Sequence, residues 1–108
     1  MAWYDYVAWF FAGAFLANSI PHLVQGMSGN RFQTPFASPP GVGESSAIVN
    51  VVWGFVNVAI GGVLLRVSAP TEGPLPWSLC LAGLIGALAL GLYLASRFGK
   101  VRNAPPHP

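Results

Sequence analysis

Long apolar stretches dominate the chain, and the charged residues lie between them. Three long stretches without any charged residue cover positions 6–30, 45–65 and 73–96. A helix of about 20 residues crosses the hydrocarbon core of a membrane, so each stretch is long enough to span it. The pattern predicts an all-α integral membrane protein with three transmembrane helices, at about residues 3–25, 45–66 and 75–98.

The composition supports a membrane protein. Of the 108 residues, 54% are hydrophobic and 7% are charged, whereas soluble domains carry roughly 25% charged residues. We expect a single membrane domain at residues 1–99 and a polar tail at residues 100–108. Asp5 and several aromatic residues stand where a signal peptide would carry Lys or Arg, so we expect no cleavage. The single cysteine, Cys80, excludes an intrachain disulfide.

The distribution of positive charge predicts the orientation in the membrane. With three spans, the first loop and the C-terminus share one side, which holds Arg31, Arg97, Lys100 and Arg102, and the other side has Arg66. Lys and Arg concentrate in cytoplasmic loops. We therefore expect a protein of the inner (plasma) membrane with its N-terminus outside and its C-terminus in the cytoplasm. Because topology explains the net charge of +2, no nucleic acid partner is expected.

Polar residues collect at the end of the first predicted helix, where a membrane accepts apolar residues more readily. Asn18, His22 and Gln25 follow one another at i+4 and i+3, so they lie on one side of the helix. Pro21 removes a backbone hydrogen bond, which predicts a loosened turn at residues 17–22. This polar stripe either binds a ligand or satisfies the freed carbonyl group and itself.

A small and polar face runs along the second predicted helix. Asn50, Gly54, Asn57 and Gly61 follow one another at i+4, i+3 and i+4, and Trp53 is adjacent. Asn57 lies about midway along the span, where an unpaired amide is costly. We therefore expect it to face protein, another subunit or a cavity. The two asparagines serve either helix packing or a ligand or ion path.

An eighteen-residue segment, 26–43, separates these two helices. Its prolines and glycines exclude a helix or a central strand. A connection this long is uncommon unless it is functional or disordered, and the aromatic, uncharged sequence of residues 32–43 disfavours disorder. The prediction is an ordered Gly/Pro-rich loop at or in the membrane interface. Its candidate lid residues are Phe32, Pro35, Phe36, Pro39 and Pro40.

The third predicted helix carries small residues and no visible chemistry. Gly83, Ala87 and Gly91 are spaced by four and form a face on which another helix can pack closely. Two other helices cannot cover this face together with Asn57, so we expect self-association or a partner complex. Gly99 is placed where a helix commonly ends.

The loop region resembles a known group of sequences. The run reads Asn18-x-x-Pro21-His22, then Gly26-x-x-Gly29-x-x-Phe32-x-Thr34-Pro35-Phe36-Ala37-x-Pro39-Pro40-Gly41-x-Gly43-x-Ser45. It is similar to small bacterial multi-pass membrane proteins without an assigned activity. The resemblance covers residues 18 to about 57, and it implies a membrane protein without implying catalytic or binding residues.

Two functional hypotheses remain open. Without an acid/base or nucleophile pair, the first is a protein that acts by helix packing, as a homo-oligomer or an accessory subunit of a membrane complex. The alternative is a binding or catalytic site for a quinone, an isoprenoid or an acyl chain, with His22 as hydrogen-bond partner or general base. Its candidate residues are Asn18, His22, Gln25, Asn50, Trp53 and Asn57. No metal and no cofactor is predicted, although His22 of two subunits could ligate a haem.

The two helices beside the loop run in opposite directions, so residues equally far from the loop lie at equal depth. His22 and Asn50 are each about 5 Å from their helix ends at a rise of 1.5 Å per residue. An unpaired polar group at this depth is costly. We therefore expect His22 and Asn50 to meet directly or through one water molecule, beneath residues 32–41.

Overall fold

The computed structural model describes residues 1–104, and three long helices make up most of them. The helices are α1 (Trp3–Met27), α2 (Ala47–Val67) and α3 (Trp77–Arg102), and two short strands, β1 (Phe32–Gln33) and β2 (Glu44–Ser45), lie between α1 and α2. Each helix is long and apolar enough to cross a membrane. The prediction of an all-helical chain with three such helices is confirmed.

Most helix ends lie within two residues of the predicted positions, and the C-terminal end of α3 lies further away for a clear reason. α3 does not end near residue 98 but continues through Gly99 to Arg102. The helix ends instead at Asn103, whose side-chain amide donates to the carbonyl oxygen of Gly99 at 2.9 Å. Gly99 is therefore an interior residue of the helix, and its role as the end residue was predicted wrongly. Near the same end of the bundle, α1 runs unbroken past Pro21.

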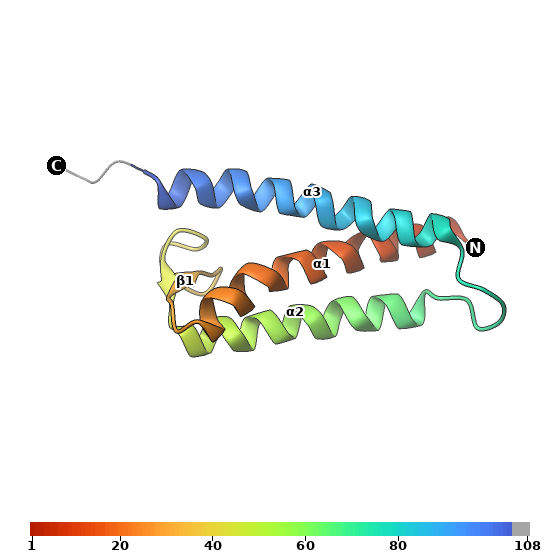
Figure 1. The fold of residues 1–108 in the computed structure, drawn as a ribbon, viewed down its shortest axis with the longest axis horizontal. Coiled ribbons are helices and arrows are strands. Elements are labelled where there is room, and N and C mark those ends of the chain that lie inside the picture. The colour runs from red at the N-terminus through yellow and green to blue at the C-terminus, as the bar shows by residue number, and fades with distance from the viewer. Residues whose placement is uncertain (105–108) are drawn as a thin grey trace.

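α1 is the central helix of the bundle. It packs against both α2 and α3, which barely contact each other within the described residues, and Figure 1 shows it between them. α1 also lies obliquely. Its N-terminal half is close to α3, and its C-terminal half is close to α2, while α3 stands apart from both at the end where the loop lies (Figure 1).

Glycines allow α1 and α3 to touch through their backbones. A Cβ atom on Gly13 would collide with the carbonyl oxygen of Gly83, and one on Gly86 would collide with the carbonyl oxygen of Phe10. This is the close approach that small residues permit between membrane helices. Part of the small face of α3 is thus used within the chain, whereas Gly91 has no neighbour near its Cβ position.

The small face of α2 receives side chains of α1. Gly54 lies against Leu23, and Gly61 lies against Leu16. Gly26 of α1 completes this contact, because a Cβ atom there would be 2.7 Å from the carbonyl oxygen of Ala47. The α1–α2 pair is therefore close along the whole C-terminal half of α1.

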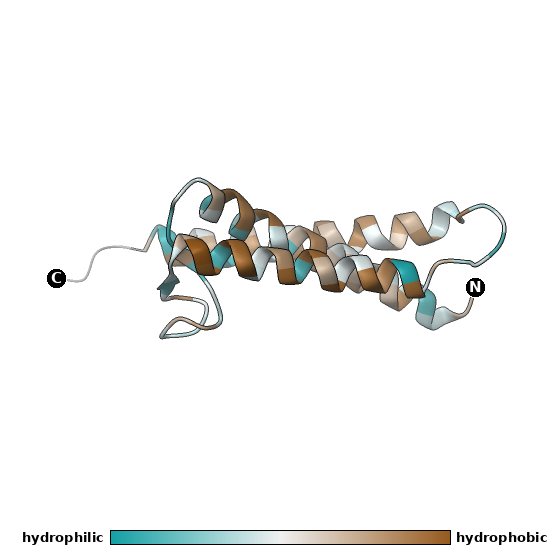
Figure 2. Cartoon of the chain, turned by 90° about the horizontal axis from the view of Figure 1, so that it is seen from below, coloured by the Kyte–Doolittle hydropathy of each residue, from teal (hydrophilic) through white to brown (hydrophobic). Residues whose placement is uncertain are grey.

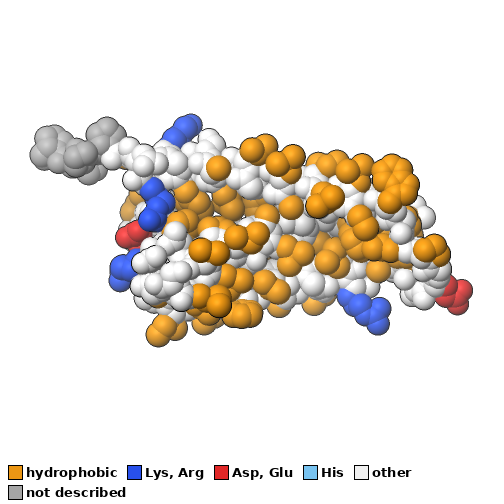
Figure 3. Space-filling model, viewed as in Figure 1, with side chains coloured by type: hydrophobic (Ala, Val, Ile, Leu, Met, Phe, Trp, Pro, Cys, Tyr) orange, Lys and Arg blue, Asp and Glu red, His pale blue; other side chains and the backbone are white. Residues whose placement is uncertain are grey.

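The surface of the bundle is apolar along its length and charged at its ends. Figure 2 shows hydrophobic residues along all three helices, and Figure 3 shows the charged side chains near the two ends of the long axis. Large side chains such as Ile48, Leu84 and Leu88 are exposed on it. Soluble monomers rarely expose apolar area of this extent, whereas a surface that faces lipid requires it.

The segment between α1 and α2 folds back on itself through a short antiparallel ribbon. β1 pairs with β2 so that Phe32 is opposite Ser45 and Gln33 is opposite Glu44. Between the strands, the backbone N–H of Gly41 donates to the carbonyl oxygen of Thr34 at 3.0 Å. Gly41 has a φ of 74°, which side chains disfavour. The ribbon, which the sequence pattern did not predict, lies over the loop end of the helices (Figure 1).

Candidate functional site

The predicted contact between His22 and Asn50 is present. Nδ1 of His22 lies 2.8 Å from Oδ1 of Asn50. Both residues are buried, with 2% of His22 and none of Asn50 exposed. The contact joins α1 to α2 one turn inside the loop end of the bundle, as the depth of the two residues predicted.

The surroundings of Asn50 fix which way its amide points. Its Nδ2 atom is 3.1 Å from the carbonyl oxygen of Phe32, 3.2 Å from that of Ser45 and 3.0 Å from that of Ser46. A rotated amide would place an oxygen among these three oxygens, which is unfavourable. Oδ1 therefore faces His22 and accepts, so Nδ1 of His22 carries the hydrogen. In the neutral imidazole, Nε2 then holds a free lone pair.

A second hydrogen-bonded pair, formed by two amides, lies deeper in the bundle. Nδ2 of Asn18 donates to Oδ1 of Asn57 at 2.9 Å, and Nδ2 of Asn57 donates to the carbonyl oxygen of Trp53 at 2.8 Å. Asn57 is fully buried. The amide that seemed to need a partner near the middle of the span finds one within the chain.

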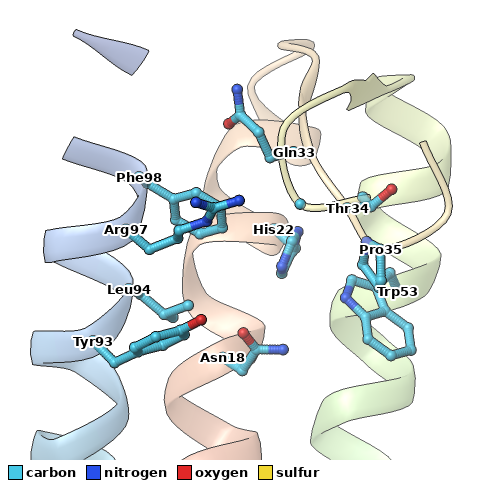
Figure 4. Close-up of a pocket in the computed structure, with 11 residues that line it drawn as sticks. Asn18, His22, Gln33, Thr34, Pro35, Trp53, Tyr93, Leu94, Arg97 and Phe98 are labelled. Atoms are coloured by element: carbon cyan, nitrogen blue, oxygen red, sulfur yellow. The ribbon is translucent and has the colours of Figure 1, made fainter. Parts of the chain in front are cut away.

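A pocket of about 220 Å³ opens beside these pairs. Figure 4 shows His22 between the side chains of α3 and Trp53 of α2. Arg97 and Phe98 form part of the α3 wall, and Gln33, Thr34, Pro35 and Gly41 contribute the loop wall. Within residues 1–104, the imidazole of His22 makes its only side-chain hydrogen bond through Nδ1, so Nε2 is available to the pocket.

Trp53 has a buried N–H group without a partner. Among the described residues, its Nε1 is inaccessible and makes no hydrogen bond. Figure 4 shows this nitrogen on the edge of the indole that faces the pocket. The ring centroids of Trp53 and His22 are 6.4 Å apart. Trp9 has an unpartnered N–H as well, but it lies beside an apolar hollow between α1 and α3.

Contacts between α3 and the ribbon close the end of the pocket. Arg102 donates to Oε1 of Gln33 at 3.0 Å and lies 3.5 Å from a carboxylate oxygen of Glu44. Its guanidinium also stands over the Phe32 ring, 4.9 Å from the centroid, and this ring packs on Phe98 with centroids 4.8 Å apart. We refer to Arg102, Gln33, Glu44, Phe32 and Phe98 as the end clamp.

The site residues predicted from the sequence fall into three groups by their position relative to the pocket. Asn18, His22 and Trp53 line the pocket, whereas Asn50 and Asn57 stand behind them as hydrogen-bond partners. Gln25 does not join them, because its Oε1 accepts from Asn30 at 3.0 Å on the exposed rim. The helical spacing predicted Gln25 on the same side of α1 as His22. It lies about one turn closer to the end of the helix than His22, outside the pocket lining.

The candidate lid residues divide similarly. Pro35 lines the pocket, and Phe32 packs on His22 with ring centroids 5.5 Å apart. Phe36 covers the opposite side of Trp53, with centroids 4.8 Å apart. Pro39 and Pro40 lie outside the pocket lining and are exposed. The cover over His22 is therefore the first half of the loop rather than its double-proline tip.

Sequence reasoning missed the whole α3 wall. Tyr93 and Arg97 line the pocket, but Arg97 had been interpreted only as a topological charge. The depth of Arg97 in the bundle could have predicted its place beside His22. The C-terminal ends of α1 and α3 both lie at the loop end of the bundle, and Arg97 and His22 are each five residues from their helix ends at Arg102 and Met27.

Comparison of the chain with protein-family models, with curated proteins and with solved structures finds no match. The described residues also contain no group of three or more His, Cys, Asp or Glu side chains that could hold a metal ion. The chemistry of the site must therefore be inferred from its own geometry. The pocket offers Nε1 of Trp53 as a buried donor and Nε2 of His22 as an acceptor, and Arg97 and Tyr93 stand on its α3 wall.

Proposed function

We propose that the protein is an integral membrane protein whose pocket binds the polar head of a lipophilic small molecule, with His22 as hydrogen-bond partner or general base. The observation that carries this proposal is the N–H of Trp53, which is buried, unpartnered and directed into the pocket. A buried polar group without a partner costs about 1–3 kcal/mol. A ligand oxygen in the pocket would remove this cost once a small shift of the indole ring uncovers the nitrogen.

The depth of the pocket suits the head of an amphiphilic molecule. His22 is five residues from the end of α1, about 7.5 Å at 1.5 Å per residue. This position is near the boundary between the headgroups and the hydrocarbon core. If the positive residues at this end face the cytoplasm, the ligand enters from the inner leaflet of the plasma membrane.

The packing hypothesis is the second candidate. Its main arguments were the small residues of α3 and the buried Asn57, but Gly83, Gly86 and Asn57 all have partners within the chain. Gly62 and Gly91 remain as positions where nothing lies within 4 Å of a Cβ atom. A partner helix could approach there, which keeps self-association open to measurement.

The test is to identify what the purified protein retains. Wild-type protein and the Trp53→Phe variant are purified in mild detergent, and the bound small molecules are identified by mass spectrometry. The substitution removes the N–H donor and keeps an aromatic ring at this position. Trp3→Phe is the matched control, because Trp3 is 75% exposed. We expect wild type and Trp3→Phe to retain one enriched lipophilic compound that Trp53→Phe loses. Retention of bulk lipid alone by all three proteins would contradict the proposal.

Native mass measured on the same preparations examines the second candidate. A defined oligomer without any enriched small molecule would favour packing as the function. A monomer that retains the compound would favour the pocket.

A further inference from the structure

We infer that the ligand is a lipid with a hydroxyl head and a single apolar chain, the head bound between His22 and Trp53 and the chain lying in a groove between α1 and α3. This inference rests on the proposed function and names the chemical class of the ligand. It combines three observations: the position of the hydrogen on Nδ1 of His22, the volume of the pocket and the groove beside the pocket.

Two ring nitrogens beside the pocket, Nε2 of His22 and Nε1 of Trp53, have no hydrogen-bond partner among the described residues, and they differ in their hydrogen-bonding roles. Asn50 holds the hydrogen of His22 on Nδ1, so Nε2 accepts, whereas the indole nitrogen of Trp53 only donates. A hydroxyl oxygen serves both groups, because it donates its hydrogen to Nε2 and accepts from the indole. The ring centroids are 6.4 Å apart, a separation that one oxygen bonded to a nitrogen of each ring can span. A carbonyl or ether head would leave Nε2 without a donor.

The pocket is too small for a whole lipid. A cavity of about 150 Å³ holds a molecule the size of benzene, so the 220 Å³ of this pocket accommodates one ring or a head group of similar size. A chain attached to this head must leave the pocket. The end clamp lies at the loop end, and two hydrogen-bonded pairs join α1 to α2, which leaves the two sides of α3 as the ways out.

An apolar groove lies next to the pocket on the α1 side of α3. It lies between α1 and α3, where α3 diverges from α1, and Leu94 and Phe98 line both the groove and the pocket. Its other walls include Pro21, Leu88 and Gly91, and no charged or hydrogen-bonding side chain lines it. Leu94 and Phe98 are the wall that the groove and the pocket share, and the chain of the ligand must pass beside these two side chains.

The length of the groove favours a long chain. Its α3 wall extends from Leu84 to Phe98, which is about 21 Å at 1.5 Å per residue. This is about two-thirds of a hydrocarbon core of about 30 Å. An acyl or isoprenoid chain would therefore run from the pocket toward the centre of the bilayer, in the direction that a membrane lipid already takes.

The test uses para-dodecylphenol as the probe, with its methyl ether, dodecyl phosphate and short-chain para-ethylphenol for comparison. Binding to the purified wild-type protein in detergent is measured by tryptophan fluorescence and by the shift in unfolding temperature. Loss of one hydrogen bond to a buried group weakens binding about tenfold. We expect the methyl ether to bind at least tenfold more weakly than the phenol, and Trp53→Phe to reduce phenol binding similarly.

Gly91→Leu examines the chain separately from the head. Its Cβ position is open, so the leucine fills the groove without a clash. Gly62→Leu is the matched control, because Gly62 is equally open and lies on α2, outside the groove. We expect Gly91→Leu to weaken para-dodecylphenol binding at least tenfold and to leave para-ethylphenol binding unchanged, while Gly62→Leu changes neither. Native mass measured on both variants excludes an effect through self-association.

Each contrary outcome has a distinct meaning. Equal binding of the phenol and its ether, or tighter binding of the phosphate through Arg97, would overturn the hydroxyl head. Equal effects of the two leucine variants would overturn the position of the chain. Failure of all probes to bind would overturn the ligand class, and the proposed function would then still stand if wild-type protein retains an enriched lipophilic compound.

Discussion

Replacing Asn50 by alanine should destabilise the protein more than any other single polar substitution in the bundle. Its side chain connects α1, α2 and the loop, through one hydrogen bond to His22 and contacts to three backbone carbonyl oxygens. Alanine removes all of these contacts. It also leaves the Nδ1–H of His22 buried without an acceptor.

The magnitude follows from these contacts. A hydrogen bond contributes about 0.5–1.5 kcal/mol net, and an unpaired buried group costs about 1–3 kcal/mol. We expect Asn50→Ala to lower the free energy of unfolding by about 3–5 kcal/mol. His22→Ala removes one such hydrogen bond and a packed ring, and it leaves Oδ1 of Asn50 unpaired, so we expect a loss of about 2–4 kcal/mol.

The double mutant isolates the contact itself. Each single mutant leaves the other residue of the pair without a partner, whereas the double mutant leaves neither. The double mutant should therefore lose less free energy of unfolding than the two single mutants added together, by about 1–3 kcal/mol. The measurement is unfolding by SDS in mixed micelles, followed by circular dichroism. Ser78→Ala is the control, because Ser78 contacts Tyr6 at the opposite end of α1, and its effect should add to that of His22→Ala.

Two results would refute this reasoning. The first is additivity of His22→Ala and Asn50→Ala to within about 0.5 kcal/mol. The second comes from Asn50→Asp, which keeps the shape of the side chain but places an oxygen where Nδ2 meets three carbonyl oxygens. It should destabilise at least as much as Asn50→Ala. If Asn50→Asp were harmless, the amide orientation and the hydrogen on Nδ1 would both be assigned wrongly.

The remaining predictions concern topology, the end clamp and helix packing. A C-terminal fluorescent-protein fusion should fluoresce in a bacterial host while a C-terminal alkaline phosphatase fusion stays inactive, and the reverse pair of results would contradict a cytoplasmic C-terminus. Arg102→Ala should speed hydrogen exchange in the ribbon relative to Arg66→Ala, and equal rates would mean that the clamp contributes nothing to order there. Gly86→Val should prevent folding because it meets the α1 backbone, whereas Gly62→Val, at an open position, should reduce stability by less than about 1 kcal/mol.

Contacts between α1 and α2 were predictable because two simple rules apply to them. The length of each apolar stretch predicts the position of each helix. Residues equally far along the chain from a shared loop lie at equal depth, which is why His22 and Asn50 were expected to meet. The orientation of the Asn50 amide was not predictable. It depends on the carbonyl oxygens of Phe32 and Ser45, which reach it only through the ribbon.

The rest of the site escaped prediction for physical reasons. Gln33 and Thr34 belong to a loop whose conformation depends on individual backbone hydrogen bonds, and no periodicity reports these. Arg97 and Tyr93 lie on a helix with no polar face, so their position in the pocket depends on how far α3 diverges from α1. That divergence follows from where the glycines permit backbone contact, a property of pairs of helices rather than of any one sequence segment.

The central position of α1 has a consequence for how the chain is made. The buried His22, Asn50 and Asn57 all find their partners between α1 and α2, which leave the ribosome before α3. A hairpin of these two helices can therefore pair its buried amides before α3 is synthesised. α3 is synthesised last of the three and adds a mostly apolar wall to the pocket.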